Sequence, residues 1–321
     1  FFLDFGILSD YTLASIAMTI RKQLLTILIL PIFFVMLPSN VRAQLGAIGG
    51  VGEGASATPV FTMTGEPLIG EGKGALAAAY LYTRFTRSFG EKIEEFSPVF
   101  GTADQNRALE VSQKIYVLAY GVTDRFNLQV LVPFINLGLK GTTDATTGQA
   151  GEDEIDGIGN TSVAFKYQFA QSPKLAVQLT WIGPSGFEPA ISTDANRVRM
   201  DLAGSFHASL ADIHLQVGYV YVGKDRADRD LSDAALANLA VARYLGGPVC
   251  TAVLELTGFR TGGVLDPKFD SPAQTSLDLT PGLKIKVKDN ISLIASVKFA
   301  LINDLALGYD TSYLFLAGYT F

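Results

Sequence analysis

The sequence predicts an all-β protein, a transmembrane antiparallel up-and-down β-barrel of about 12 strands with short periplasmic turns and longer extracellular loops. Three observations predict this fold. Hydrophobic residues make up 48% of the 321 residues, yet no run of about 18 apolar residues follows residue 43, so no transmembrane helix is available there. Apolar and polar residues instead alternate along many segments. The connections between those segments alternate between tight and long.

Period-two alternation, which is typical of strands with one apolar face, is clearest in five segments. Their apolar sets, taken mostly at every second residue, are Phe126–Phe134, Val163–Phe169, Ile213–Tyr221, Leu277–Val287 and Ile291–Phe299. In a barrel these sets face lipid, and the polar residues between them face the lumen. The predicted strands are 74–89, 108–120, 126–139, 158–170, 174–183, 197–209, 212–223, 232–245, 249–260, 275–287, 290–301 and 311–321. Alternation is weak in 74–89 and 232–245, so their lipid-facing sides stay open.

Connection lengths support the barrel over a soluble β-sandwich, which is the alternative for an exported chain of alternating strands. Tight turns fall near 123–125, 171–173, 210–212, 246–248 and 289–290. Long polar connections fall near 90–106, 140–157, 184–196, 224–231, 261–274 and 302–310. A sandwich needs no such regular alternation, whereas periplasmic turns and extracellular loops produce it.

The last strand indicates the location of the protein. Tyr313, Phe315, Ala317, Tyr319 and Phe321 share one face. A terminal Phe preceded by apolar residues at every second position resembles the recognition signal of the outer-membrane barrel assembly machinery. We therefore expect a bacterial outer-membrane location, with membrane lipid and that machinery as partners. The same strand must pair with the strand near 74–89, because a closed barrel leaves no unpaired edge in lipid.

The N-terminal part is predicted to direct export. Met18, followed by Arg21 and Lys22, begins a signal sequence over 18–43, with an apolar stretch from Leu24 and cleavage after Ala43. Residues 1–17 are expected to be translated upstream sequence. Residues 44–73, rich in Gly and without a sustained period, are predicted to be an irregular periplasmic segment near the barrel mouth. The barrel then occupies 74–321.

Charge and cysteine content exclude several classes. The net charge is −6, and the pI of about 5.0 argues against a nucleic-acid partner, which requires a basic face. Cys250 is the single cysteine, so no internal disulfide forms, and its apolar surroundings predict a small packing residue.

Two segments resemble a known family. The run Tyr120–Leu128, YGVTDRFNL, continues to Val132-Pro133-Phe134 and resembles the "YGxTDRxxLxxxxPY" hairpin of outer-membrane proteins assigned to the meta-pathway of phenol degradation. Gly157–Asn160, leading to Lys166-Tyr167, resembles that family's "GxGDxxxxxKY" strand, with Asn160 in place of Asp. The resemblance covers about 73–321. It implies transport of aromatic or other hydrophobic compounds and carries over no binding residues.

Charged and imidazole side chains on the polar faces of the strands are predicted to line the lumen. They could form a web of ion pairs that partly closes it, which the interspersed signs favour, or a ladder that guides polar solutes. The candidates are Glu110, Lys114, Lys166, Arg197, Arg199, Asp201, His207, His214, Asp278, Lys284, Lys286 and Lys298.

Three other sites are considered and not favoured. A two-residue turn at 210–211 would place His207 opposite His214, as in a metal site, but no further ligands stand nearby. The acidic stretch Glu152, Asp153, Glu154 and Asp156 could bind calcium in an extracellular loop, although a solvated loop explains it as well. His207 and Ser209 are the only nearby His–Ser pair for an outer-membrane phospholipase, but they lack that family's following Asn-Gly.

The sequence thus predicts no catalytic centre, no metal site and no cofactor. The favoured function is passive uptake of small, hydrophobic or aromatic solutes through an outer-membrane channel. A structural or partner-binding barrel without transport is the alternative, and an outer-membrane lipid hydrolase is the third.

Overall fold

The computed structural model describes residues 60–85, 108–143, 150–184, 195–208, 210–224, 233–245, 249–262, 264–266, 269–271, 273–303, 309 and 311–321. The predicted upstream extension, the predicted signal sequence and residues 44–59 lie outside these ranges, as does Ser209. Within the described residues, no helix is long and apolar enough to cross a membrane.

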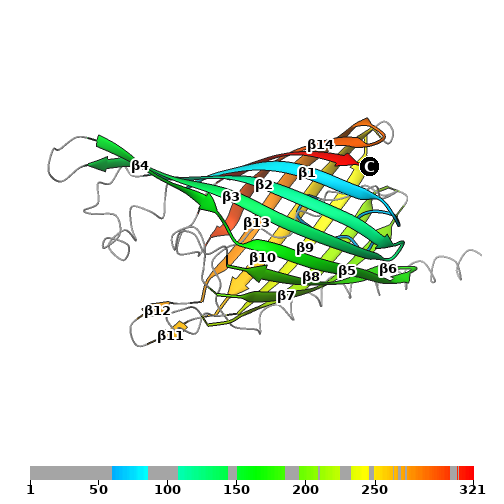
Figure 1. Ribbon diagram of the computed structural model, residues 1–321, viewed down its shortest axis with the longest axis horizontal. Coiled ribbons are helices and arrows are strands. Elements are labelled where there is room, and N and C mark those ends of the chain that lie inside the picture. The colour runs from blue at the N-terminus through cyan, green and yellow to red at the C-terminus, as the bar shows by residue number, and fades with distance from the viewer. Residues whose placement is uncertain are drawn as a thin grey trace, which may run out of the picture. The chain divides into compact units, whose positions relative to one another are not determined.

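Twelve antiparallel strands close into a barrel, as predicted (Figure 1). The sheet has 13 strands, but β4 and β5 pair with successive parts of β3 and so share one position in the wall, leaving twelve. The strands are β1 (Gly74–Phe85), β2 (Ala108–Thr123), β3 (Phe126–Thr143), β4 (Ala150–Ile158), β5 (Thr161–Gln171), β6 (Lys174–Gly183), β7 (Arg197–His207), β8 (Asp212–Val222), β9 (Ala234–Tyr244), β10 (Cys250–Thr261), β13 (Thr275–Lys288), β14 (Ile291–Asn303) and β15 (Thr311–Thr320).

The closing seam joins the last strand to the first, as the sequence predicts. β15 pairs with β1 from Ala75↔Thr320 to Arg84↔Thr311. Gly74 and Phe321 then exchange two backbone hydrogen bonds of 2.9 Å. Every wall position therefore has two neighbours, and the barrel presents no free edge to lipid.

Two predicted connections contain strands instead of loops. The acidic residues of 152–156 lie in β4, where Glu154 pairs with Gly138 and Asp156 with Asn136 of β3. Pairing in this extended hairpin satisfies the backbone and overrides the low strand propensity of acidic residues. The connection 261–274 likewise holds a small hairpin of β11 (Val264–Asp266) and β12 (Phe269–Ser271).

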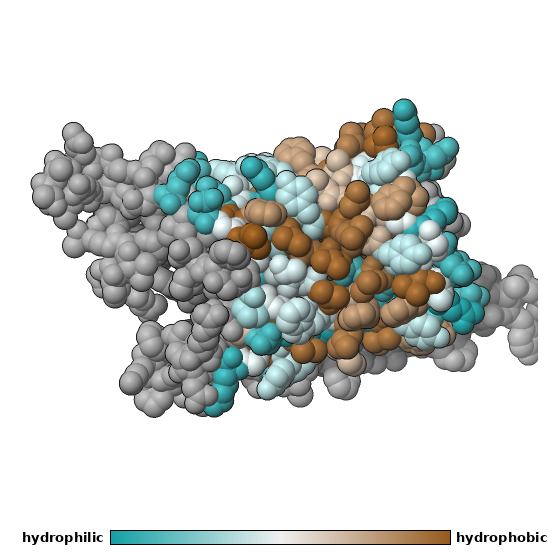
Figure 2. Space-filling model, in the orientation of Figure 1, coloured by the Kyte–Doolittle hydropathy of each residue, from teal (hydrophilic) through white to brown (hydrophobic). Residues whose placement is uncertain are grey.

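The apolar sets predicted to face lipid lie outside. On β5, for example, Phe165, Tyr167 and Phe169 are exposed while Lys166 between them is buried. Figure 2 shows hydrophobic side chains gathered across the middle of the barrel wall, with hydrophilic ones towards its two ends. Cys250 is half-buried at the start of β10. This distribution is that of a wall with an apolar outer band.

The two weakly patterned strands also acquire definite faces. On β1 the exposed side is that of Leu76 and Tyr80, whereas Ala77, Ala79 and Leu81 are buried inside. On β9 Leu239 and Val241 point outward and Ala240 is buried inside. Both faces of these strands are apolar, and this explains why the sequence shows little alternation there.

Candidate functional site in the barrel interior

An irregular stretch of chain, residues 60–73, enters the barrel and is here named the inner segment. It lies towards the end of the barrel that carries the tight turns, such as Thr123–Phe126 and His207–Asp212, which we name the short-turn end. Val60 to Thr64 are almost fully buried, as are Glu66, Leu68 and Ile69. Residues 60–69 are therefore enclosed by the wall and occupy part of the lumen, whereas residues 71–73 are exposed.

Glu255 on β10 holds the start of the inner segment. The backbone N–H groups of Val60 and Phe61 donate to its carboxylate, the latter at 2.9 Å to Oε2. Thr62 adds its backbone N–H at 2.7 Å and its hydroxyl at 2.8 Å. Glu255 is fully buried, so these donors replace the water that a carboxylate otherwise requires.

The next residue of the segment contacts a polar network on β7, β8 and β9. The backbone N–H of Met63 donates to Gln216 Oε1 at 2.8 Å, and Asn238 Nδ2 donates to the same oxygen at 2.9 Å. The amide of Gln216 in turn donates to Asp201 at 2.8 Å, and Asp201 pairs with Arg199 at 2.7 Å. Acid, base and amide therefore satisfy one another on this wall.

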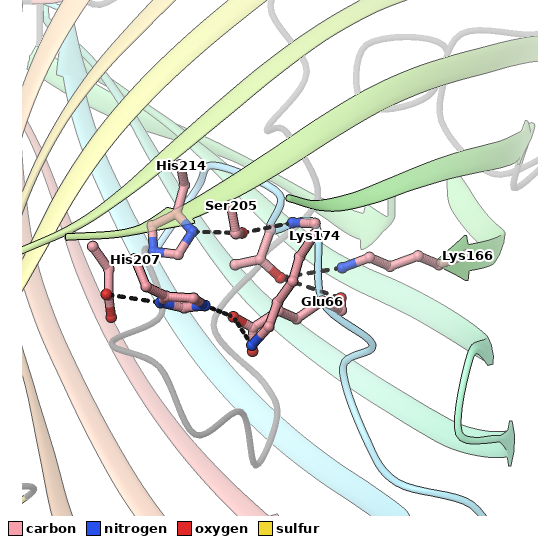
Figure 3. Close-up of polar contacts among 9 residues, drawn as sticks. Glu66, Lys166, Lys174, Ser205, His207 and His214 are labelled. Atoms are coloured by element: carbon pink, nitrogen blue, oxygen red, sulfur yellow. Dashed lines mark hydrogen bonds and ion pairs between the residues drawn. The ribbon is translucent and has the colours of Figure 1, made fainter. Parts of the chain in front are cut away.

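A second cluster lies near the short-turn end, around Glu66 (Figure 3). Lys174 Nζ and His207 Nε2 each lie 3.0 Å from Glu66 Oε1. The other ring nitrogen of His207 is 2.8 Å from Asp212, and Lys166 donates to the Thr64 hydroxyl at 3.3 Å. The inner segment is thus bound here by side chains from β5, β6 and β7, while Asp212 of β8 holds the His207 ring.

Between these clusters, Ser205 links the segment to His214. The backbone N–H of Gly65 donates to Ser205 Oγ at 2.8 Å, and Ser205 Oγ is 2.8 Å from His214 Nδ1. Both side chains are buried. The Ser–His contact therefore holds the backbone of the inner segment and is covered by it.

The end of the inner segment is attached by backbone hydrogen bonds. Gly72 N–H donates to Gly121 O at 2.8 Å, and Gly121 N–H donates to Lys73 O at 3.0 Å. Asn127 adds its side-chain amide, which donates to Ile69 O at 2.8 Å. A Cβ at Gly121 would stand 2.0 Å from Gly70 O, so only glycine permits this close approach.

The opposite inner wall is apolar. Val60, Phe61, Leu68 and Ile69 of the inner segment pack there in one hydrophobic cluster. The wall residues of this cluster come from β1, β2, β14 and β15 and are Ala75, Ala77, Ala79, Leu81, Ile115, Val117, Ala119, Ile294, Leu314 and Leu316. The interior therefore has one apolar wall and one polar wall, with the inner segment between them.

The structure places most of the predicted lumen residues inside. Lys166, Arg197, Arg199, Asp201, His214 and Asp278 are buried. Lys298, also on the inner face, pairs with Asp278 at 2.8 Å. Lys284 is half-buried, Lys286 is exposed beside Asp289 at 3.1 Å, and His207 lies at the short-turn end. Acids and bases thus form pairs along the wall, while their role in solute passage stays a prediction.

Two predicted lumen residues lie on the outer face instead. Lys114 is exposed and pairs in register with Tyr80 and Phe134, both of which point outward. Glu110 shares its face and lies 3.9 Å from Arg84. The prediction was wrong because inner positions of β2 such as Val111 and Ile115 are apolar, so that both faces of this strand carry apolar residues and alternation does not identify the lumen side.

The predicted histidine pairing is also wrong. His207 pairs with Asp212, and His214 with Ser205, because the turn is two residues longer than expected. Among the described residues, no three His, Cys, Asp or Glu side chains are grouped so that they could hold a metal ion.

Several residues that bind the inner segment were not predicted. Glu255, Gln216, Ser205 and Asn127 all belong to the polar faces of their strands. The signal available for Glu255 was a lone acid between Leu254 and Leu256 on the face of Thr251 and Thr257. Such a buried charge requires a partner, but the sequence does not indicate that the partners are backbone N–H groups of the inner segment.

Comparisons with known proteins agree on the fold. Residues 85–304 match the model of a family described as "Putative MetA-pathway of phenol degradation". An outer membrane channel from Pseudomonas putida F1 is similar at 14% identity and a TM-score of 0.60, over 80% of this chain and 97% of that one. No curated protein matches the sequence.

Two further solved structures are similar at lower scores. The translocator domain of the autotransporter NalP from Neisseria meningitidis has 12% identity and a TM-score of 0.48, over 78% of this chain and 89% of that one. The CymD monoaromatic hydrocarbon channel has 10% identity and a TM-score of 0.40, over 78% and 88%.

Proposed function

Because the chain belongs to the family of the MetA pathway of phenol degradation, we propose that it is a bacterial outer-membrane channel for passive uptake of small hydrophobic or aromatic compounds. In the outer membrane such a channel has its short-turn end towards the periplasm and its long connections towards the outside of the cell. The signal sequence over 18–43 and the terminal strand Tyr313–Phe321 serve export and insertion by the barrel assembly machinery.

The observation that carries the proposal is the division of the interior into two walls. Side chains such as Ala77, Ile115 and Leu314 offer an apolar surface on one side. The charge pair of Arg199 and Asp201, with the amide of Gln216, faces it from the other. Along the apolar wall, an apolar solute can leave water without a cost in free energy, while the polar wall keeps water in the path. The similar channel from Pseudomonas putida F1 supports the same assignment.

Facilitated diffusion fits this interior better than coupled transport. The polar groups bind one another or the inner segment. Each solute then moves down its own concentration gradient. The inner segment then forms the constriction, since it extends from Glu255 on β10 to Gly121 on β2. Because the inner segment packs against the apolar wall, passage of small solutes along that wall requires the segment to move aside.

A flux measurement tests the proposal. Liposomes that contain the purified barrel should release or admit small aromatic compounds faster than empty liposomes, with selectivity over sugars of equal size. Heat-denatured protein provides the control. Liposomes that remain as tight as empty ones toward phenolics, hydrocarbons, sugars and ions would reject transport.

A structural barrel without transport is the second candidate. The dense contacts of the inner segment with both walls favour it, because each contact narrows the lumen. The same flux measurement separates the two, since a structural barrel leaves the liposomes tight.

A further inference from the structure

We propose that the inner segment is a displaceable gate, with residues 60–69 as its arm, Gly70–Lys73 as its pivot and the Glu255 carboxylate as its latch. This inference rests on the proposed channel function and adds to it a positioning residue that sets how often the lumen opens.

The pivot is the part of the segment that the barrel backbone holds. Gly72 and Lys73 exchange backbone hydrogen bonds with Gly121 at 2.8 and 3.0 Å. Gly72 adopts φ +72°, a conformation open to glycine that turns the chain sharply before β1. Gly70 and Gly74 flank it, so the chain changes direction here with little steric hindrance. The arm can therefore move about this point while β1 stays in place.

The arm is held by side chains and not by the strand ladder. Its backbone groups bind Glu255, Gln216, Ser205 and Asn127. The ring of strand pairings is complete without it, from β1–β15 through to β2–β3. Departure of the arm thus breaks no ladder bond, and this distinguishes it from a wall strand.

Glu255 is the contact that holds the start of the arm. It receives the N–H groups of three successive residues, Val60, Phe61 and Thr62, as well as the Thr62 hydroxyl. An ionised acceptor forms stronger hydrogen bonds than a neutral one. When the arm leaves, water that enters the lumen can solvate the same carboxylate, so release is opposed by the latch but not forbidden.

The apolar contacts of the arm are suited to release. Much of the wall beneath it is alanine, at 75, 77, 79 and 119, so the arm lies on a shallow surface. Val60 stands beside Gly282, where an added Cβ would lie 3.4 Å from its methyl group. The ring of Phe61 faces Lys298 Nζ at 5.4 Å. These contacts stabilise the closed position without interlocking it.

The position of the arm is tested by thiol labelling. In a Cys250→Ser background, Met63→Cys places a thiol at a position that is 2% exposed. Glu255→Gln keeps the side-chain size but removes the charge and replaces one acceptor oxygen with a donor. We expect a hydrophilic maleimide to label Met63→Cys at least about tenfold faster when Glu255→Gln is present, because the latch loses charge-assisted bonds.

Glu110→Gln is the matched control, since Glu110 lies on the outer face of β2. It should leave the labelling rate unchanged. Folding of each variant is checked by the mobility shift of the unheated barrel in SDS gels, so that accelerated labelling of an intact barrel reports arm movement and not unfolding.

Single-channel recording in planar bilayers provides the functional readout. Glu255→Gln should raise the open fraction or conductance several-fold, and Glu255→Asp should restore most of the closed behaviour. Equal labelling and equal conductance in Glu255→Gln and the parent would overturn the gate. Faster labelling in a barrel that passes neither ions nor solutes would instead reject the channel function and leave the latch in place.

Discussion

Gly121 is a position in the barrel wall where a single methyl group should disturb the inner segment. In Gly121→Ala the new Cβ would stand 2.0 Å from Gly70 O and 2.9 Å from Ile69 O. Both are backbone atoms, so no side chain can rotate away and the pivot itself must shift. The shift would also strain the two backbone hydrogen bonds that join Gly121 to Gly72 and Lys73.

The magnitude follows from these two effects. Overpacking of a filled interior costs about 1–3 kcal/mol, and each lost backbone hydrogen bond costs about 1 kcal/mol. We therefore expect Gly121→Ala to lower the free energy of unfolding by about 2–5 kcal/mol. A partial release of the arm would place the result at the lower end, because the strain is then relieved.

Urea unfolding of the barrel in lipid vesicles, followed by tryptophan fluorescence and gel mobility, measures the difference. Gly138→Ala is the matched control, because a Cβ there meets no heavy atom closer than 4.0 Å. That variant should unfold within about 1 kcal/mol of the parent, as glycine in a strand is mildly unfavourable. If Gly121→Ala were as stable as Gly138→Ala, the close approach of the pivot to β2 would be wrong.

Three further predictions test other parts of the structure. Lys114→Leu should stabilise the barrel by up to about 2 kcal/mol in urea unfolding, since it removes a charge from the lipid-facing side. Lys298→Leu should instead destabilise the barrel, because Asp278 loses its ion-pair partner at 2.8 Å. A stabilising Lys298→Leu would contradict the assignment of inner and outer faces. Ser205→Ala should cost about 1–3 kcal/mol in the same assay, because the Gly65 N–H loses its acceptor, and an unchanged midpoint would argue against an enclosed arm. Deletion of Phe321 should reduce the fraction of folded barrel in outer-membrane preparations several-fold, measured by gel mobility, because two seam bonds to Gly74 are lost; normal assembly would remove the role given to the terminal residue.

The wall of the barrel could be predicted from the sequence because lipid imposes one repeated rule. Each strand must show apolar residues outward, and tight and long connections must alternate, so strands such as Lys174–Gly183 have the predicted bounds. Alternation does not identify the lipid-facing side where both faces of a strand are apolar. β2 has apolar residues on both faces, and there the sequence offers no means to tell Lys114 from a lumen residue.

The candidate site was less predictable, because its partners are far apart in the chain and one partner is irregular. Thr62 and Glu255 are 193 residues apart, and a backbone N–H carries no sequence signal. The polarity that the inner wall requires also depends on which residues pack against it. Ala77 and Ile115 look like lipid-facing residues until Leu68 and Ile69 are known to pack against their side of the wall.

The first strand joins these two parts of the molecule, since β1 is both the continuation of the inner segment and one side of the closing seam. Its seam begins at Gly74, which pairs with Phe321 directly after the pivot. A Cβ at Gly74 would meet the Phe321 ring at 2.4 Å, so the aromatic terminus covers this junction. Movement of the arm therefore ends at Gly70–Lys73, and the pairing from Ala75 onward keeps its register. A gate attached at this point can open the lumen without opening the wall, which a segment tethered to the middle of a strand could not do.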